Sequence, residues 1–184
     1  TKIGWLLIAL SVILSVWVIV SQSSDASQTT ESGLVLSDDR TVLEQYTGSG
    51  GAVTIPDGVT TISAGVFKEK DVTQVIMPSS VTSMGTGVFS GCSSLASVSL
   101  STSLNSIPED SFRECLSLGS VTIPDSATTI ASNAFYGCAS LSSVSIPASV
   151  SSISTDAFSG CGNLSDISVA SGNGAYASSD GCLY

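Results

Sequence analysis

The chain contains no histidine, and its five lysines and arginines stand against fifteen aspartates and glutamates, a formal net charge of −10. Histidine is the commonest general base and the commonest metal ligand, so its absence removes the usual starting point of a catalytic or metal site. No G-x-S-x-G, P-loop or dinucleotide-binding motif occurs. The basic residues are scattered, whereas nucleic acid binding requires clustered Lys and Arg. We therefore expect no enzyme activity or catalytic residue, no cofactor or metal, and no nucleic acid partner.

Long apolar runs are also rare, with one exception at the N-terminus. Ile3 to Val20 carries no charge, and at about 1.5 Å per residue a helix here would be roughly 27 Å long, near the hydrocarbon thickness of a bilayer. The alternative is a cleaved signal peptide with Lys2 as its positive residue, but a signal core is only about 7–15 residues long. Trp5 and Trp17 lie near opposite ends, where interfacial indoles are expected. These features favour a retained transmembrane helix over residues 1–22.

This helix has a face suited to a protein partner. Small side chains let transmembrane helices approach closely, and Ser11 and Ser15 share a helical face with Gly4 and Ile8. We expect this face to contact an integral membrane protein. Lys2 is the only nearby positive charge, so the N-terminus should lie inside and the rest of the chain on the non-cytoplasmic side.

Two short segments follow the apolar run. Residues 23–33 are polar and rich in serine, as in a flexible linker. In residues 34–52, Leu34–Leu36 and Val42–Leu43 flank the turn-forming Ser37–Asp39, which predicts a hairpin. Terminal units of repeat stacks are atypical, so we expect this hairpin to cap the solenoid that follows.

Residues 53–169 repeat with a period of 22 or 23 residues. A fixed period of this length with one short strand per unit is typical of a solenoid, in which each coil buries its apolar edge against the next. Four kinds of residue keep the register: Phe67, Phe89, Phe112, Phe135 and Phe158; Cys92, Cys115, Cys138 and Cys161; Leu95, Leu118, Leu141 and Leu164; and Pro56, Pro78, Pro124 and Pro147, with Ser101 in the missing proline position.

Each unit contains a strand whose last residues alternate apolar and polar, as in LASVSL, LGSVTI, LSSVSI and LSDISV. Stacking should join these strands into one parallel sheet at about 4.8 Å spacing. The inward positions are Val98, Leu100, Val121, Ile123, Val144, Ile146, Ile167 and Val169, and the outward positions are Ser99, Thr122, Ser145 and Ser168. This outward row is either an ordinary solvated face or a partner-binding surface, and solenoids commonly bind partners on such a face.

The in-register cysteines have three interpretations. Cysteine is among the residues most often fully buried, which favours reduced thiols in the core. A disulfide between adjacent coils would have poor geometry because the Cβ vectors run parallel. A zinc site would need paired C-x-x-C spacing, which is absent.

Phrases such as IPDGVTTISAGVF, FSGCSSLASVSL and IPASVSSISTDAFSGCGNLSDISV resemble the BspA-type leucine-rich repeats over about residues 53–169. The resemblance implies a β-rich leucine-rich-repeat solenoid. It also implies a role in adhesion or protein binding, because members of this family serve those roles on bacterial surfaces and occur in protists and algae.

Two functions remain open for a protein-binding chain with a membrane helix. We favour an accessory or scaffolding subunit of a larger membrane assembly, because four or five coils make a small adhesive surface; a thylakoid or other photosynthetic membrane is one location. The alternative is a cell-surface adhesin that the helix tethers to the plasma membrane. Residues 170–184 depart from the repeat and form either a partial coil or a C-terminal cap.

Overall fold

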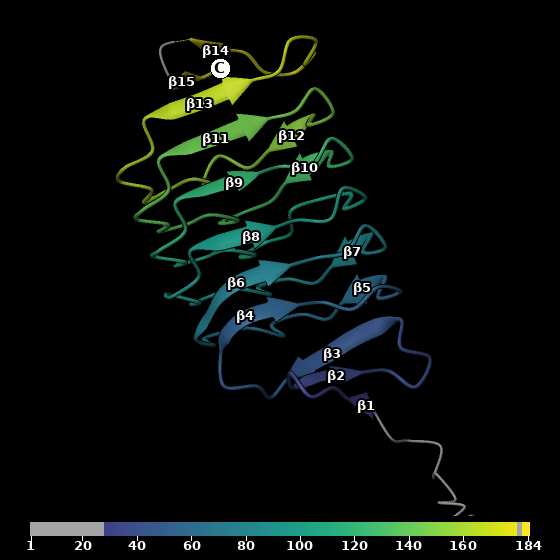
Figure 1. The fold of residues 1–184 in the computed structure, drawn as a ribbon. Coiled ribbons are helices and arrows are strands. Elements are labelled where there is room, and N and C mark those ends of the chain that lie inside the picture. Colours follow the sequence, from purple (N-terminus) through teal and green to yellow (C-terminus); the bar gives the residue numbers. More distant parts are fainter. Residues whose placement is uncertain (1–27, 180–181) are drawn as a thin grey trace, which may run out of the picture.

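Short parallel strands stack in register along one wall of a solenoid, as the alternating apolar and polar residues predict (Figure 1). The computed structural model describes residues 28–179 and 182–184. The predicted transmembrane helix with its contact face, and residues 23–27 of the predicted linker, lie outside these residues. Within the described ranges, no helix has the length and apolar character needed to cross a bilayer.

The first wall consists of six strands, one from each coil: β4 (Gly51–Thr54), β6 (Val72–Ile76), β8 (Ser97–Ser99), β9 (Ser120–Thr122), β11 (Ser143–Ile146) and β13 (Asp166–Val169). Within β4, β6 and β8, and within β9, β11 and β13, neighbouring strands pair in parallel with equivalent residues opposite each other; Val144, for example, lies between Val121 and Ile167. The inward positions of β9 and β11 are buried and their outward positions are exposed or half-buried.

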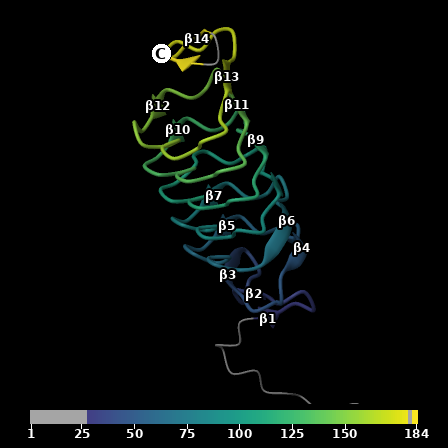
Figure 2. The ribbon, with the colours of Figure 1, turned by 90° about the vertical axis from the view of Figure 1, so that its left-hand side faces the viewer.

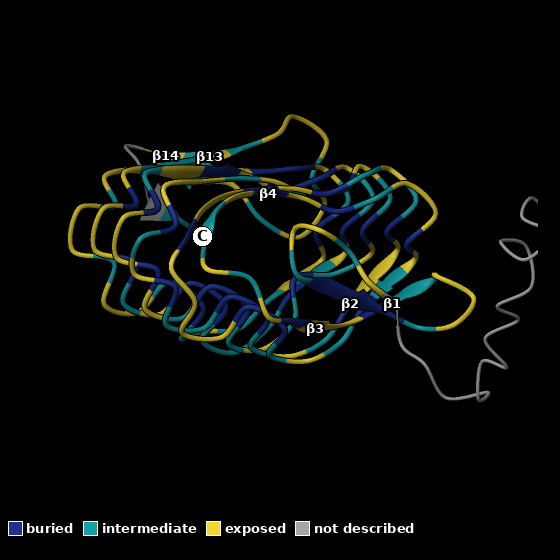
Figure 3. Cartoon of the chain, turned by 60° about the horizontal axis from the view of Figure 1, so that its bottom comes forward, coloured by how far each residue is buried: buried dark blue, intermediate teal, exposed yellow. Residues whose placement is uncertain are grey.

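A second wall, which the sequence did not predict, lies opposite the first (Figures 2 and 3). It contains β3 (Val42–Tyr46), β5 (Thr61–Ile62) and β7 (Ser83–Met84), and, further along, β10 (Thr129–Ile130) and β12 (Ser152–Ile153), all paired in parallel. Most of these strands are only two residues long, too short for an alternating pattern to identify.

Hairpins lie at both ends of the stack. At the N-terminal end, β2 (Leu34–Leu36) pairs antiparallel with β3 and with β1 (Gln28–Thr29), and β3 continues into the second wall beside β5. The carboxylate of Asp39 accepts hydrogen bonds from Ser37 and Thr41, which close the β2–β3 turn and lower the pKa of Asp39. At the C-terminal end, β14 (Ser178–Ser179) pairs antiparallel with β15 (Cys182–Leu183).

A column of stacked aromatic rings runs through the core. The rings of Phe67, Phe89, Phe112 and Phe135 are fully buried, and successive phenylalanine centroids lie 5.2–5.3 Å apart as far as Phe158. Offset-stacked rings at such spacings add to the stabilisation that burial alone provides. A contact between coils thus explains the regular spacing of phenylalanine along the sequence.

Both walls are interrupted around the coil of residues 95–117, which corrects the prediction of one continuous sheet. In the described part of the chain, β8 and β9 belong to different sheets, and so do β7 and β10. In the second wall the N–H of Gly85 donates to the carbonyl of Ile62, and the N–H of Ala131 donates to the carbonyl of Ile107. Pro108 occupies the equivalent position in the coil between them, and proline has no N–H with which to bond the preceding coil. In the first wall Ser142 donates to Gly119, but no bond joins Gly119 to Ala96 among the described residues.

Candidate functional site

The first wall presents twelve outward side chains in two columns, here called the outer sheet face. The columns follow the strand register: Ala52, Gln74, Ser97, Ser120, Ser143 and Asp166 in one, and Thr54, Ile76, Ser99, Thr122, Ser145 and Ser168 in the other. All are exposed except the half-buried Ser143. The four residues that the sequence placed outward, Ser99, Thr122, Ser145 and Ser168, therefore lie on this face. Asp166 is its single charged group.

The hydroxyls of this face are free of internal bonds. Within residues 28–179 and 182–184, none of the twelve side chains makes a side-chain hydrogen bond. Many hydroxyls elsewhere tie adjacent coils together: Ser117 donates to the Ser93 carbonyl at 2.7 Å and Ser126 to the Leu104 carbonyl at 2.6 Å. The outer sheet face thus has donors and acceptors available for another molecule, whereas the turn hydroxyls serve the fold.

The thiols form a second row, inside the solenoid. Cys92, Cys115 and Cys138 are buried, as the sequence predicts, while Cys161 is half-buried. Each thiol donates to the carbonyl of a phenylalanine in the preceding coil, at 2.8–3.1 Å, so the cysteine spacing follows the phenylalanine spacing. The spacing of both residues is visible in the sequence, but the bond between them is not.

Burial leaves the inner thiols poorly suited to chemistry. Burial raises the pKa of Cys92 to about 11, and burial also raises the pKa of Cys115. Contact with Cys161, together with burial, raises the pKa of Cys138, while the same contact lowers that of Cys161. Reactive cysteines are thiolates, so the inner thiols are structural groups. No cluster of potential metal ligands occurs in the described part of the chain.

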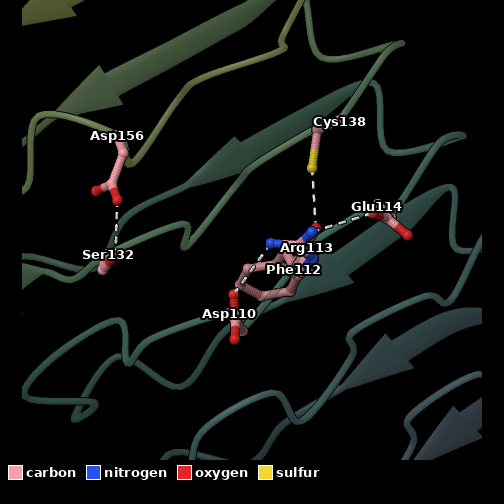
Figure 4. Close-up of polar contacts among 7 residues, drawn as sticks. All are labelled: Asp110, Phe112, Arg113, Glu114, Ser132, Cys138 and Asp156. Atoms are coloured by element: carbon pink, nitrogen blue, oxygen red, sulfur yellow. Dashed lines mark hydrogen bonds and ion pairs between the residues drawn. The ribbon is translucent and has the colours of Figure 1, made fainter.

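A charged cluster lies on the turn side of the interrupted coil (Figure 4). Arg113 contacts Asp110 at 3.8 Å and Glu114 at 3.4 Å, and its guanidinium lies 4.5 Å from the ring centroid of Tyr136. Glu114 has φ 57°, a left-handed conformation that glycine adopts at the equivalent position 137 in the next coil. These groups are exposed or half-buried and mutually paired, so the cluster braces neighbouring coils.

The fold defines the class of protein: a solenoid of short parallel coils that repeats a phenylalanine, a cysteine and a leucine at fixed positions is a leucine-rich-repeat protein. A family model described as the BspA-type leucine-rich repeat region matches residues 47–178 in six copies. The chain therefore belongs to the BspA-type leucine-rich-repeat family, with more coils than the four or five that the sequence suggested.

Solved structures agree with this assignment. A leucine-rich cell surface protein of Faecalibacterium prausnitzii is 35% identical with a TM-score of 0.70, over 74% of this chain and 37% of its own. A leucine-rich repeat protein of T. pallidum is 32% identical with a TM-score of 0.69, over 76% and 70%. One from Eubacterium ventriosum is 25% identical with a TM-score of 0.63, over 82% and 45%.

The chain thus spans little more than a third of the first of these proteins. A search of curated protein sequences finds no match. The family and its solved members are leucine-rich-repeat proteins, and this repeat family is typically non-enzymatic.

Proposed function

We propose that this chain is a non-enzymatic protein-binding module displayed at a cell surface, and that the outer sheet face is its docking surface. The observation that carries the proposal is the contrast between hydroxyls. Those on the outer sheet face make no side-chain hydrogen bond within the described chain, while many turn hydroxyls are bonded to neighbouring coils. A broad, nearly uncharged face with free donors and acceptors suits a protein partner, because extended solenoid faces are the usual binding surfaces of repeat proteins.

The solved relatives favour the cell-surface role over the accessory subunit. The F. prausnitzii protein is described as a cell surface protein, which supports an adhesin-like module held at the membrane. In this proposal Ile3–Val20 is the anchor that keeps the repeats on the non-cytoplasmic side.

The docking surface can be tested with matched charge substitutions. Cells that display the full chain are assayed for adhesion to a panel of purified, immobilised extracellular proteins. Thr122→Lys places a charge in the middle of the outer sheet face, and we expect it to reduce adhesion at least about tenfold, as an unpaired buried charge would. Ser83→Lys places the same charge on the exposed surface of β7 in the second wall and should leave adhesion unchanged. Equal adhesion by both variants and the wild type would refute the proposed surface.

The anchor and its contact face need separate tests. A retained helix makes the protein resist alkaline carbonate extraction, whereas a mature chain that begins near Ser23 would identify a cleaved signal peptide. Replacing Ser11 and Ser15 by Leu keeps the segment apolar and fills the face shared with Gly4 and Ile8. An adhesin keeps its display and adhesion after this double substitution. A subunit dissociates from its assembly in mild detergent while its repeats remain folded, and that result would restore the accessory-subunit function.

A further inference from the structure

The outer sheet face has one apolar site that departs from its polar pattern, on the second of its six strands. Ile76 is its one large apolar side chain and is 40% exposed. In the same column its neighbours across the sheet are Thr54 and Ser99. A single exposed apolar side chain is ordinary on a protein surface, but one that adjoins further uncovered apolar surface is typical of an interaction site.

The interruption of the first wall lies beside this residue. Val98 and Leu100 point inward from β8, yet both are half-buried, while their equivalents Val121 and Ile123 in the next coil are buried. The strand pair β8 and β9 lacks the ladder that joins the other neighbours in this wall, within the described chain. The seam between the two strands therefore leaves apolar surface partly uncovered one strand away from Ile76.

The surroundings of this apolar site are polar and uncharged. Ser97, Ser99, Ser120 and Thr122 border the seam with exposed side chains. The single charge of the face, Asp166 on β13, is four strands from β6, or about 19 Å at the usual strand spacing. Hot spots of protein interfaces combine such an apolar site with a polar rim that excludes water.

We propose that Ile76 and the β8–β9 seam form the hot spot for an uncharged polypeptide segment, which places an apolar side chain against Ile76 and bonds its backbone to the surrounding hydroxyls. This inference rests on the proposed docking role of the outer sheet face. An ionised partner group would lose its hydration here without meeting an opposite charge. A neutral polysaccharide is disfavoured because none of the twelve side chains is aromatic, so no ring is present for a sugar to stack on.

The experiment uses random linear peptides displayed on phage and selected against the full chain in mild detergent. Selected peptides should be poor in charged residues and should contain an aliphatic or aromatic residue. Their dissociation constants are then measured for four proteins: wild type, Ile76→Ser, Thr54→Ser and Ser83→Thr. Ile76→Ser installs the hydroxyl that Ser99 carries beside it, Thr54→Ser is a conservative change in the same column, and Ser83→Thr lies on the second wall.

We expect Ile76→Ser to weaken peptide binding at least about tenfold and the two controls to change it less than about twofold. Circular dichroism and thermal unfolding check that each variant keeps the fold, and since Ile76 is exposed its replacement should do so. If Thr122→Lys abolishes binding while Ile76→Ser does not, the outer sheet face binds but has its centre elsewhere, and this inference alone fails. If neither variant matters, or no peptide is selected, both this inference and the proposed function fail. Binding of soluble dextran that depends on Ile76 would replace the polypeptide by a polysaccharide.

Discussion

The two ends of the solenoid are closed by different means. At the N-terminal end Tyr46 lies 5.1 Å from Phe67 and ends the aromatic column with a ring that is only 2% exposed. At the C-terminal end Phe158 is only half-buried. One end of the core is sealed by an aromatic side chain, while the other is only partly covered.

Hydrogen bonding compensates at the C-terminal end. The hydroxyl of Tyr176 accepts a hydrogen bond from the N–H of Ile153 at 2.7 Å, and the hydroxyl of Ser178 accepts one from the N–H of Val169 at 3.1 Å. These two bonds occupy edge donors of the second and the first wall, which would otherwise be free to pair with another chain. The comparison shows that a solenoid can be closed by covering its core or by satisfying its strand edges.

The largest effect should come from breaking the aromatic column in its middle. Phe112→Ala removes a fully buried ring that stacks on two others, and we expect a loss of about 3–5 kcal/mol of unfolding free energy. Phe158→Ala, at the half-covered end, should cost only about 1–2 kcal/mol because its ring is partly in water already. Urea unfolding of both variants measures the difference. Equal losses would mean that the C-terminal end is as well sealed as the interior.

Alkaline pH should separate the buried thiols from the end thiol. The pKa of Cys92 is raised from 9.0 to about 11 in the folded chain, so above pH 9 the unfolded chain loses this proton before the folded chain does. Cys92 should then lower the unfolding free energy by up to about 1.4 kcal/mol per pH unit between pH 9 and 11. Below pH 9 this thiol should cause no change of stability with pH. Cys92→Ser should reduce that slope.

The thiol at the C-terminal end provides the control for this experiment. Cys161 is half-buried, and its contact with Cys138 lowers its own pKa while raising that of Cys138, so its thiol should be the first of the row to ionise. In the native wild type Cys161 should be alkylated before Cys92, Cys115 and Cys138, which mass spectrometry of digested protein can follow. Faster labelling of Cys115 than of Cys161 would contradict the assignment of the inner thiols to the core.

The polar parts of the two caps should contribute less. The hydroxyl of Tyr46 accepts the Gly50 N–H at 3.1 Å and donates to the Gly50 carbonyl at 3.3 Å. Tyr46→Phe keeps the ring and removes the two bonds to Gly50, and Tyr176→Phe keeps the ring and removes the bond from the Ile153 N–H. Each substitution should lower the unfolding free energy by about 1 kcal/mol. Thermal unfolding compares them, and a Tyr46→Phe loss as large as that of Phe112→Ala would show that the hydroxyl rather than the ring closes the N-terminal end.

The smallest effect is expected on the outer sheet face. Thr122 is exposed and makes no side-chain bond among the described residues, so Thr122→Ala should change stability by less than about 0.5 kcal/mol. Chemical unfolding measured beside Phe112→Ala tests this. A loss above about 1 kcal/mol would show that the hydroxyls of this face support the fold rather than a partner.

The repeat, the inward and outward positions of the first wall and the burial of three thiols could be predicted from the sequence. They depend on the identity of residues at fixed spacing, and each coil repeats the same local geometry. Ser99, Thr122, Ser145 and Ser168 could be placed outward for the same reason. Their role in binding stays a prediction, because alternation specifies the direction of a side chain and not what it contacts.

Only the tertiary structure decided where the repeat fails and how it ends. The second wall has strands of two residues, whose pairing depends on neighbouring coils rather than on a local pattern. Pro108 is an ordinary loop residue in the sequence; it interrupts the second wall because it has no N–H to donate to the preceding coil. In the first wall no bond joins Gly119 to Ala96 among the described residues, although both residues have the backbone groups for it. Tyr46 lies outside the repeating register, and its stacking on Phe67 follows from the return of the hairpin over the first coil. Periodic contacts are thus encoded locally and repeatedly, whereas the seam and the caps depend on single contacts between residues distant in the chain.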